Sequence, residues 1–227
     1  MQPSGESNGQ GAGVSLSKVT LTKSAPQVSL EKSAARGVLR VNLNWTARPP
    51  QQQAPASGGW LKKLQSALAP QPGIDLDLGC LWEFSDGSKG VVQALGNAFT
   101  ARTADGRVVI SLDGDDRSGA SVGGENLSID LAHLDAVRRI LVFALIYEGV
   151  PNWEQARAVT TVSPADGPAI EVLLDEADPA ARVCGVALLE NTGGQLSVRR
   201  EVRYVRGGQD LLDQAYGWGL EWAPGRK

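Results

Sequence analysis

Histidine and cysteine are scarce in this chain, whose 227 residues include one histidine, His133, and two cysteines, Cys80 and Cys184. A zinc site of the Cys/His type would need all three to converge, without the close ligand spacing typical of such sites. A catalytic Ser-His-Asp or Cys-His group would depend on His133 alone, which lies in a predicted helical turn between strands. We therefore expect a protein that is not an enzyme, with both cysteines reduced and buried.

Long hydrophobic runs and excess positive charge are also missing. The longest apolar run, residues 140–147, is far shorter than the ~18 residues of a membrane-spanning helix. Residues 1–6 have neither the basic nor the apolar region of a secretory signal. A net charge of −3 and a pI near 5.3 give no general reason for binding nucleic acid. We expect a cytoplasmic protein with no transmembrane segment and no nucleic-acid partner.

Short runs with the alternating pattern of β-strands account for most of the sequence. Residues 37–45 alternate well, and residues 139–147 are apolar on both faces, which predicts a strand at the centre of a sheet. Short strands at ~8–12-residue spacing with few helices predict an all-β fold, an antiparallel two-sheet β-sandwich. The expected strands span residues 14–21, 37–45, 74–84, 90–95, 107–112, 127–131, 139–147, 159–162, 169–174, 184–190 and 196–205.

Composition predicts one domain, residues 13–227, preceded by a disordered segment at 1–12. Residues 46–72 form a flexible, Pro- and Gln-rich insertion, in which residues 60–68 have the pattern of a short amphipathic helix. This helix would pack on its own domain, stay mobile, or dock on a partner or membrane surface. Residues 216–222 contain two tryptophans and are interpreted as a strand that seals the sandwich; exposed tryptophans there would indicate an interface.

The arginines of the 196–205 strand and its end suggest two uses. They could hold a phosphate or an acidic partner, or they could form a solvated face that protects a sheet edge from pairing. These residues are Arg199, Arg200, Arg203 and Arg206.

Two acidic, glycine-rich stretches, residues 73–81 and 112–126, stand out from the rest of the chain. In the first, Asp75 and Asp77 alternate with leucines, so they point the same way at roughly 7 Å on a strand. The second adds further carboxylates and an amide in a loop rich in turn residues. Oxygen donors on a flexible backbone suit Ca²⁺ better than Mg²⁺. The alternative is that both stretches are ordinary solvated turns.

Several motifs, in the right order, resemble the TerD-domain stress proteins of bacterial tellurium-resistance systems, and within them the TerA-like branch. The resemblance covers most of residues 13–217 apart from the insertion. The matching segments are Gly-Val-Ser-Leu-Ser-Lys at 13–18, Ile-Asp-Leu-Asp at 74–77, Gly-Asp-Asp-Arg-Ser-Gly at 114–119, the acidic start of the strand at 124–131, Ile-Tyr-Glu at 146–148 and Asn-Trp-Glu-Gln-Ala-Arg at 152–157.

This resemblance implies a β-sandwich similar to C2 domains that binds calcium at one acidic end and has no known catalytic activity. The carboxylates at matching positions are Asp75, Asp77, Asp115, Asp116, Glu125 and Glu148, and Asp113 and Asn126 are neighbouring oxygen donors added on chemical grounds. Gly73 replaces a common family aspartate, and residues 120–126 are less acidic than the family's usual run. Fewer carboxylates lower calcium affinity, so we expect fewer calcium sites than is typical of the family.

The leading hypothesis is a calcium-binding stress-response protein of a tellurium-resistance system. It would act through other tellurium-resistance or stress proteins, in a complex at the inner face of the membrane. One alternative is a calcium-independent scaffold that uses the inserted helix and the Trp-rich C-terminus for assembly. Another is a metal-dependent hydrolase built on the carboxylates, for which an obvious general base is missing.

Overall fold

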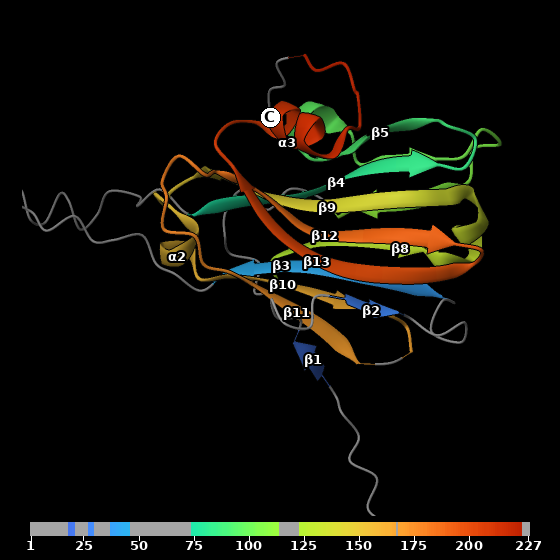
Figure 1. Ribbon diagram of the computed structural model, residues 1–227, viewed down its shortest axis with the longest axis horizontal. Helices are drawn as coiled ribbons and strands as arrows, with labels where there is room; N and C mark the ends of the chain where they lie inside the picture. The colour runs from blue at the N-terminus through green and yellow to red at the C-terminus, as the bar shows by residue number, and fades with distance from the viewer. Residues whose placement is uncertain are drawn as a thin grey trace, which may run out of the picture.

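The computed structural model describes residues 18–20, 27–29, 37–45, 74–113, 123–166 and 168–223, and its strands form two packed sheets (Figure 1). Sheet A has the order β1 (Lys18–Thr20), β11 (Ala169–Leu174), β10 (Ala158–Ser163), β3 (Val38–Trp45), β8 (Glu125–Asp130), β7 (Val108–Leu112) and β6 (Thr100–Arg102). Sheet B has the order β2 (Gln27–Ser29), β13 (Gln195–Val205), β12 (Val183–Thr192), β9 (Val137–Glu148), β4 (Asp75–Phe84) and β5 (Lys89–Val92).

Pairing between neighbouring described strands is antiparallel except for β1, which runs parallel to β11. The predicted all-β, two-sheet antiparallel sandwich is therefore confirmed. The described helices are short: η1 (Leu95–Asn97), η2 (Leu131–Ala136), α2 (Trp153–Ala156) and α3 (Gln209–Tyr216). The predicted helical turn around His133 corresponds to η2.

The main core lies between the two sheets and follows from the alternation seen in the sequence. In β3, Leu39, Val41 and Leu43 are fully buried, while the residues between them are half-buried or exposed. The inward residues of β8 alternate in the same way, and both strands face the inner side chains of sheet B. Burial of these apolar side chains is the main source of stability, at ~25 cal/mol per Å² removed from water.

Strand β9 lies inside sheet B between β12 and β4, as its two apolar faces predict. Strand β4 differs from the expectation of a half-buried strand, because nearly all of its residues are buried on both faces. The reason is a second apolar cluster on the outer face of sheet B, where Leu81, Leu141 and Phe143 pack against Leu212 and Trp218. Helix α3 and the residues after it therefore cover a face that usually meets water (Figure 1).

The predicted strand over residues 216–222 is wrong. Helix α3 ends at Tyr216, and the chain continues without regular structure from Gly217, whose φ of 61° places it in the left-handed region. Glycine adopts this conformation at little cost, so it ends the helix and turns the chain back over sheet B. The C-terminal aromatic residues seal the fold by covering a face rather than by pairing as a strand.

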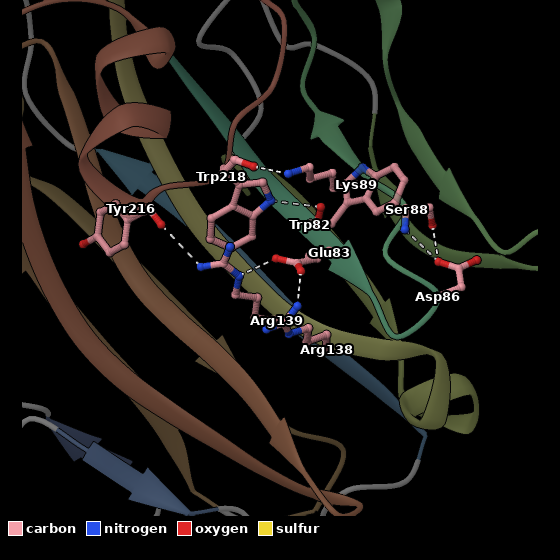
Figure 2. A network of polar contacts seen from close by, with 9 residues as sticks. All are labelled: Trp82, Glu83, Asp86, Ser88, Lys89, Arg138, Arg139, Tyr216 and Trp218. Atoms are coloured by element: carbon pink, nitrogen blue, oxygen red, sulfur yellow. Dashed lines mark hydrogen bonds and ion pairs between the residues drawn. The ribbon is translucent and has the colours of Figure 1, made fainter.

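Trp218 joins this C-terminal cover to sheet B at three points (Figure 2). Its indole N–H donates to the carbonyl of Trp82 at 3.0 Å, and its own carbonyl accepts from Lys89 Nζ at 2.5 Å. The guanidinium carbon of Arg139 lies 3.9 Å from the centre of the indole ring. A tryptophan ring can attract such a cation through its π-electrons. Trp218 is 0% exposed, so it acts as an anchor rather than as an exposed interface residue.

A buried aspartate, Asp213, shapes the chain that follows α3. One of its carboxylate oxygens accepts from the backbone N–H of Gly219 at 2.6 Å. The other accepts from the backbone N–H of Leu220 at 2.8 Å and from the indole N–H of Trp222 at 2.9 Å. By accepting from three donors in the chain that follows α3, the Asp213 carboxylate fixes the path of residues 217–222.

Glu83 is the acidic centre of the network in Figure 2, and its side chain is 8% exposed. It accepts from Arg139 Nε at 2.6 Å and from Arg138 Nη1 at 2.5 Å. Burial works against ionisation of Glu83, but the hydrogen bond from Arg139 and the neighbouring positive charges outweigh it. The pKa of Glu83 therefore lies below its ordinary value.

We expect the Glu83 contacts to lose their stabilising effect in acid. A carboxyl whose pKa is lower in the folded state stabilises the fold above the unfolded pKa of about 4.3, and this contribution disappears as pH falls through the folded pKa. Glu83→Gln should lower the free energy of unfolding by about 1–2 kcal/mol at pH 7, and the difference from wild type should shrink below pH 4. Urea unfolding at pH 7 and pH 3.5 measures this. Glu190→Gln, at an exposed position, is the control; an equal difference at both pH values would contradict the assignment.

Three of the four arginines in and just after β13 contact other groups of the protein. Arg199 pairs with Glu201 at 2.8 Å, Arg206 pairs with Asp178 at 2.7 Å, and Arg203 Nη1 donates to the carbonyl of Ala215 at 2.9 Å. Strand β2 pairs with β13 only from Ser197 to Arg199, so Arg200, Arg203 and Arg206 lie beyond the part of the edge that β2 covers. Their arrangement fits a solvated face better than a phosphate site.

Both cysteines are buried and free, as predicted, and burial raises the pKa of each thiol. None of the described helices is long and apolar enough to cross a membrane. The expectations for residues 1–12, for the insertion at 46–72 with its helix at 60–68, and for Asp115 and Asp116 lie outside the described residues.

Candidate functional site

Four of the carboxylates predicted to bind calcium lie towards the end of the sandwich where β4 begins and β9 ends, near α2 (Figure 1). We call Asp75, Asp77, Glu125 and Glu148 the acidic end. Asp75 is in register with Glu148 across the two strands. Residues directly opposite in an antiparallel pair have Cβ atoms about 5 Å apart, and like charges in such a pair repel. Two carboxylates in this position are better tolerated when a cation lies between them.

Asp75 and Asp77 share one side of β4, as the sequence predicts. They alternate with Leu76 and Leu78, which belong to the core between the sheets, so the two aspartates are on the outer side of sheet B. They are nevertheless 5% and 1% exposed. An ionised carboxylate at this depth needs hydrogen-bond donors or a positive charge to offset the loss of hydration.

Glu125 links the second acidic stretch to the first. It lies at the start of β8 in sheet A with its side chain 2% exposed, and its Oε2 accepts from the backbone N–H of Leu78 at 2.6 Å. Strand β5 pairs with β4 from Cys80 to Glu83, so Leu78 lies beyond the part of β4 that β5 covers. The Glu125 carboxylate takes the place of a neighbouring strand there. The two acidic stretches thus meet at this contact.

Asp113 and Asn126 are neighbours of one another rather than of the aspartates on β4. The backbone N–H of Asp113 donates to the carbonyl of Asn126 at 2.8 Å. The amide oxygen of Asn126 accepts from Asn42 Nδ2 at 2.9 Å. Asn126 alternates with Glu125 along β8, so the two side chains lie on opposite faces of sheet A. The geometry separates Asn126 from the carboxylate of Glu125.

The donors at the acidic end are all oxygens, which suits a hard cation such as Ca²⁺. Within the described residues, the structure finds no group of three or more His, Cys, Asp or Glu side chains that could hold a metal ion. Asp115 and Asp116, the remaining predicted ligands, lie outside that part of the chain. The donor chemistry fits calcium, and the described carboxylates would need this loop to complete a site.

Sequence reasoning missed two residues that shape the acidic end. Gly124 has a φ of 66°, and a Cβ there would lie 2.1 Å from the carbonyl oxygen of Leu43. The guanidinium of Arg182 donates to the carbonyls of Ile146 and Tyr147, next to Glu148. The family motif included Gly124 and could have indicated its role. Arg182 is more than thirty positions from the strand it contacts, so no local pattern could have indicated it.

No family model matches this chain. Among solved structures, the fold is similar to that of a homologue of the telluride resistance protein TerD from Streptomyces coelicolor A3(2). The TM-score is 0.50 at 21% identity, with 78% of this chain and 95% of that one covered. The fold thus belongs to the class of two-sheet sandwiches that this TerD homologue represents.

A curated relative is closer in sequence. The chain is 42% identical over 214 residues to the tellurium resistance protein TerA of an Alcaligenes species. On this likeness the chain is a relative of the tellurium resistance protein TerA, in line with the resemblance of its motifs. The match covers 94% of this chain and 60% of the relative, so the chain spans less than two thirds of that protein's length.

Proposed function

We propose that this protein is a non-enzymatic, calcium-binding stress-response component of a bacterial tellurium-resistance system. The 42% identity to a tellurium resistance protein supports the biological system. The observation that best supports calcium is the placement of Asp75 directly opposite Glu148, with Asp77 buried on the same side of β4. This arrangement concentrates negative charge at the end of the sandwich where β4 begins and β9 ends.

The residues that would hold calcium are Asp75, Asp77 and Glu148, with Asp115 and Asp116 from the loop. When bound, the ion would neutralise these carboxylates and bring the loop against the end of sheet B. Glu125 supports the backbone of β4, because its Oε2 accepts from the backbone N–H of Leu78. We propose that this ordering creates the surface on which a partner docks.

The partners we propose are other proteins of the tellurium-resistance or stress system, in a complex at the inner face of the cytoplasmic membrane. In the alternative hypothesis, a calcium-independent scaffold would use the inserted helix and the Trp-rich C-terminus as its assembly surfaces. Trp218 is fully buried against sheet B, and Tyr216 and Trp222 pack on the same cluster. These aromatic residues are occupied within the fold, which weakens the scaffold alternative at that surface.

Survival on tellurite tests this function in cells. A host strain that lacks the chromosomal copy would be complemented with wild type, with Asp75→Asn/Asp77→Asn, or with Asp86→Asn/Asp105→Asn. The last pair changes exposed turn residues away from the acidic end and serves as the control at equal charge change. We expect wild type and control to restore growth and the Asp75/Asp77 variant to fail at equal protein level. If the strain without any copy grew on tellurite as well as the complemented strain, the role in tellurium resistance would be refuted. Full rescue by the Asp75/Asp77 variant would refute the role of calcium.

A further inference from the structure

We propose that Arg182 is a positioning residue of the acidic end, which holds the irregular end of β9 that brings Glu148 opposite Asp75. This inference rests on the proposed calcium function, and it adds a residue that does not itself bind the ion. It also gives a role to the Asn-Trp-Glu-Gln-Ala-Arg motif at 152–157, which calcium binding alone leaves unexplained.

A bulge in β9 decides which side chain meets Asp75. Leu76 pairs with Ile146, but the next residue back on β4, Asp75, pairs with Glu148 instead of Tyr147. Strand β9 therefore carries one extra residue at this point. In a regular ladder Tyr147 would lie opposite Asp75, and Glu148 would move one step beyond it. A β-bulge commonly redirects a side chain next to a functional site in this way.

Arg182 holds both carbonyls at the bulge. Its Nη2 donates to the carbonyl of Ile146 at 2.7 Å and to that of Tyr147 at 3.0 Å, and its Nε donates to Ile146 at 3.1 Å. Its own carbonyl accepts from the backbone N–H of Ile146 at 2.9 Å. The planar fork of a guanidinium can serve two adjacent carbonyls at once, whereas the single ammonium of lysine holds them less rigidly.

The position of Arg182 is itself fixed by α2 and the residue that precedes it. The indole N–H of the fully buried Trp153 donates to the carbonyl of Ala181 at 2.7 Å. Asn152 Nδ2 donates to the carbonyl of Ala177 at 2.8 Å, and the backbone N–H of Glu154 donates to Glu176 at 3.0 Å. The 152–157 motif thus holds the segment before β12, and Arg182 extends that support to β9.

A different role for Arg182 predicts the opposite effect on calcium. If its positive charge simply opposed an incoming cation, removing the charge would tighten calcium binding, and a lysine that keeps the charge would change nothing. If Arg182 positions Glu148, both substitutions weaken calcium binding, because in either case the guanidinium no longer donates to the carbonyls of Ile146 and Tyr147 at the bulge. The signs of the two variants therefore separate the roles.

Calcium titration by calorimetry of full-length wild type, Arg182→Lys and Arg182→Gln makes this test. Supporting residues behind a metal ligand commonly contribute 10–100-fold in affinity, so we expect each variant to bind at least about tenfold more weakly. Arg206→Lys is the matched control, since Arg206 forms an exposed ion pair with Asp178 of the same segment. The calcium affinity of Arg206→Lys should stay within about twofold of wild type, because exposed ion pairs contribute little.

Hydrogen exchange at the backbone N–H of Ile146, measured without calcium, is the second readout. Exchange should be faster in Arg182→Lys and unchanged in Arg206→Lys, because the Arg182 guanidinium holds the bulge in the calcium-free protein too. Unchanged exchange, or tighter calcium binding in Arg182→Gln, would overturn the positioning role. Absence of calcium binding by wild type would instead refute the proposed function, and the exchange result would then decide the role of Arg182 on its own.

Discussion

Replacing Trp218 by alanine should lower the free energy of unfolding by about 3–5 kcal/mol, the range for removal of a large buried aromatic side chain. The indole fills the centre of the outer cluster on sheet B, and its loss leaves a cavity between α3 and β4. It also removes the donor to the Trp82 carbonyl and the ring that Arg139 covers. Urea unfolding followed by far-ultraviolet circular dichroism measures the change.

Leu173→Ala is the control for Trp218→Ala, because Leu173 is 54% exposed on sheet A and should change stability by less than about 1 kcal/mol. If Trp218→Ala were equally mild, the C-terminal cover would not be an integral part of the fold. The apolar outer face of sheet B would then have to tolerate water, which its residues Leu81, Leu141 and Phe143 make unfavourable.

Gly124→Ala should destabilise the protein by about 2–4 kcal/mol, as the sum of left-handed backbone strain and a steric clash. The added Cβ would lie 2.1 Å from the Leu43 carbonyl oxygen, and backbone cannot move aside as a flexible side chain can. The start of β8 would have to shift, and Glu125 with it. We therefore also expect a weaker contact between Glu125 and Leu78 in this variant.

Gly96→Ala separates the two causes. Gly96 has a similar φ of 75°, but a Cβ there meets no atom within 4 Å. Gly96→Ala should lower the free energy of unfolding by about 1–2 kcal/mol through backbone strain alone. Thermal unfolding of both variants gives the comparison. Equal losses would mean that the close approach of β3 to Gly124 has no energetic consequence, contrary to the geometry.

Much of the sandwich could be predicted because its signal is local. Alternation in 37–45 and the two-sided apolar pattern of 139–147 each depend on neighbouring residues, and both strands formed as expected. The same local reasoning failed for β4, where Asp75 and Asp77 suggested a solvated face. On that face Leu81 packs against Leu212 of the distant α3 and against Trp218, and alternation carries no information about what packs on a strand.

The C-terminus shows a similar limit. Tyrosine and tryptophan favour strands, so the aromatic residues after position 215 predicted one. Gly217 in the left-handed region and the three donors to Asp213 produced a helix followed by an irregular cover instead. At the candidate site, the carboxylates were visible in the sequence, but the bulge that pairs Asp75 with Glu148 was not. A bulge follows from register between strands far apart in the chain.

Calcium titration of the purified protein by calorimetry tests the central claim most directly. Wild type should bind calcium with a dissociation constant on the order of micromolar, the range of sensor sites. Asp75→Ala/Asp77→Ala and Asp115→Ala/Asp116→Ala should each abolish the heat of calcium binding. A single site with ligands from both β4 and the 114–119 loop needs both pairs of aspartates. If the folded wild-type protein gave no binding heat up to millimolar calcium, the proposed calcium site would be contradicted.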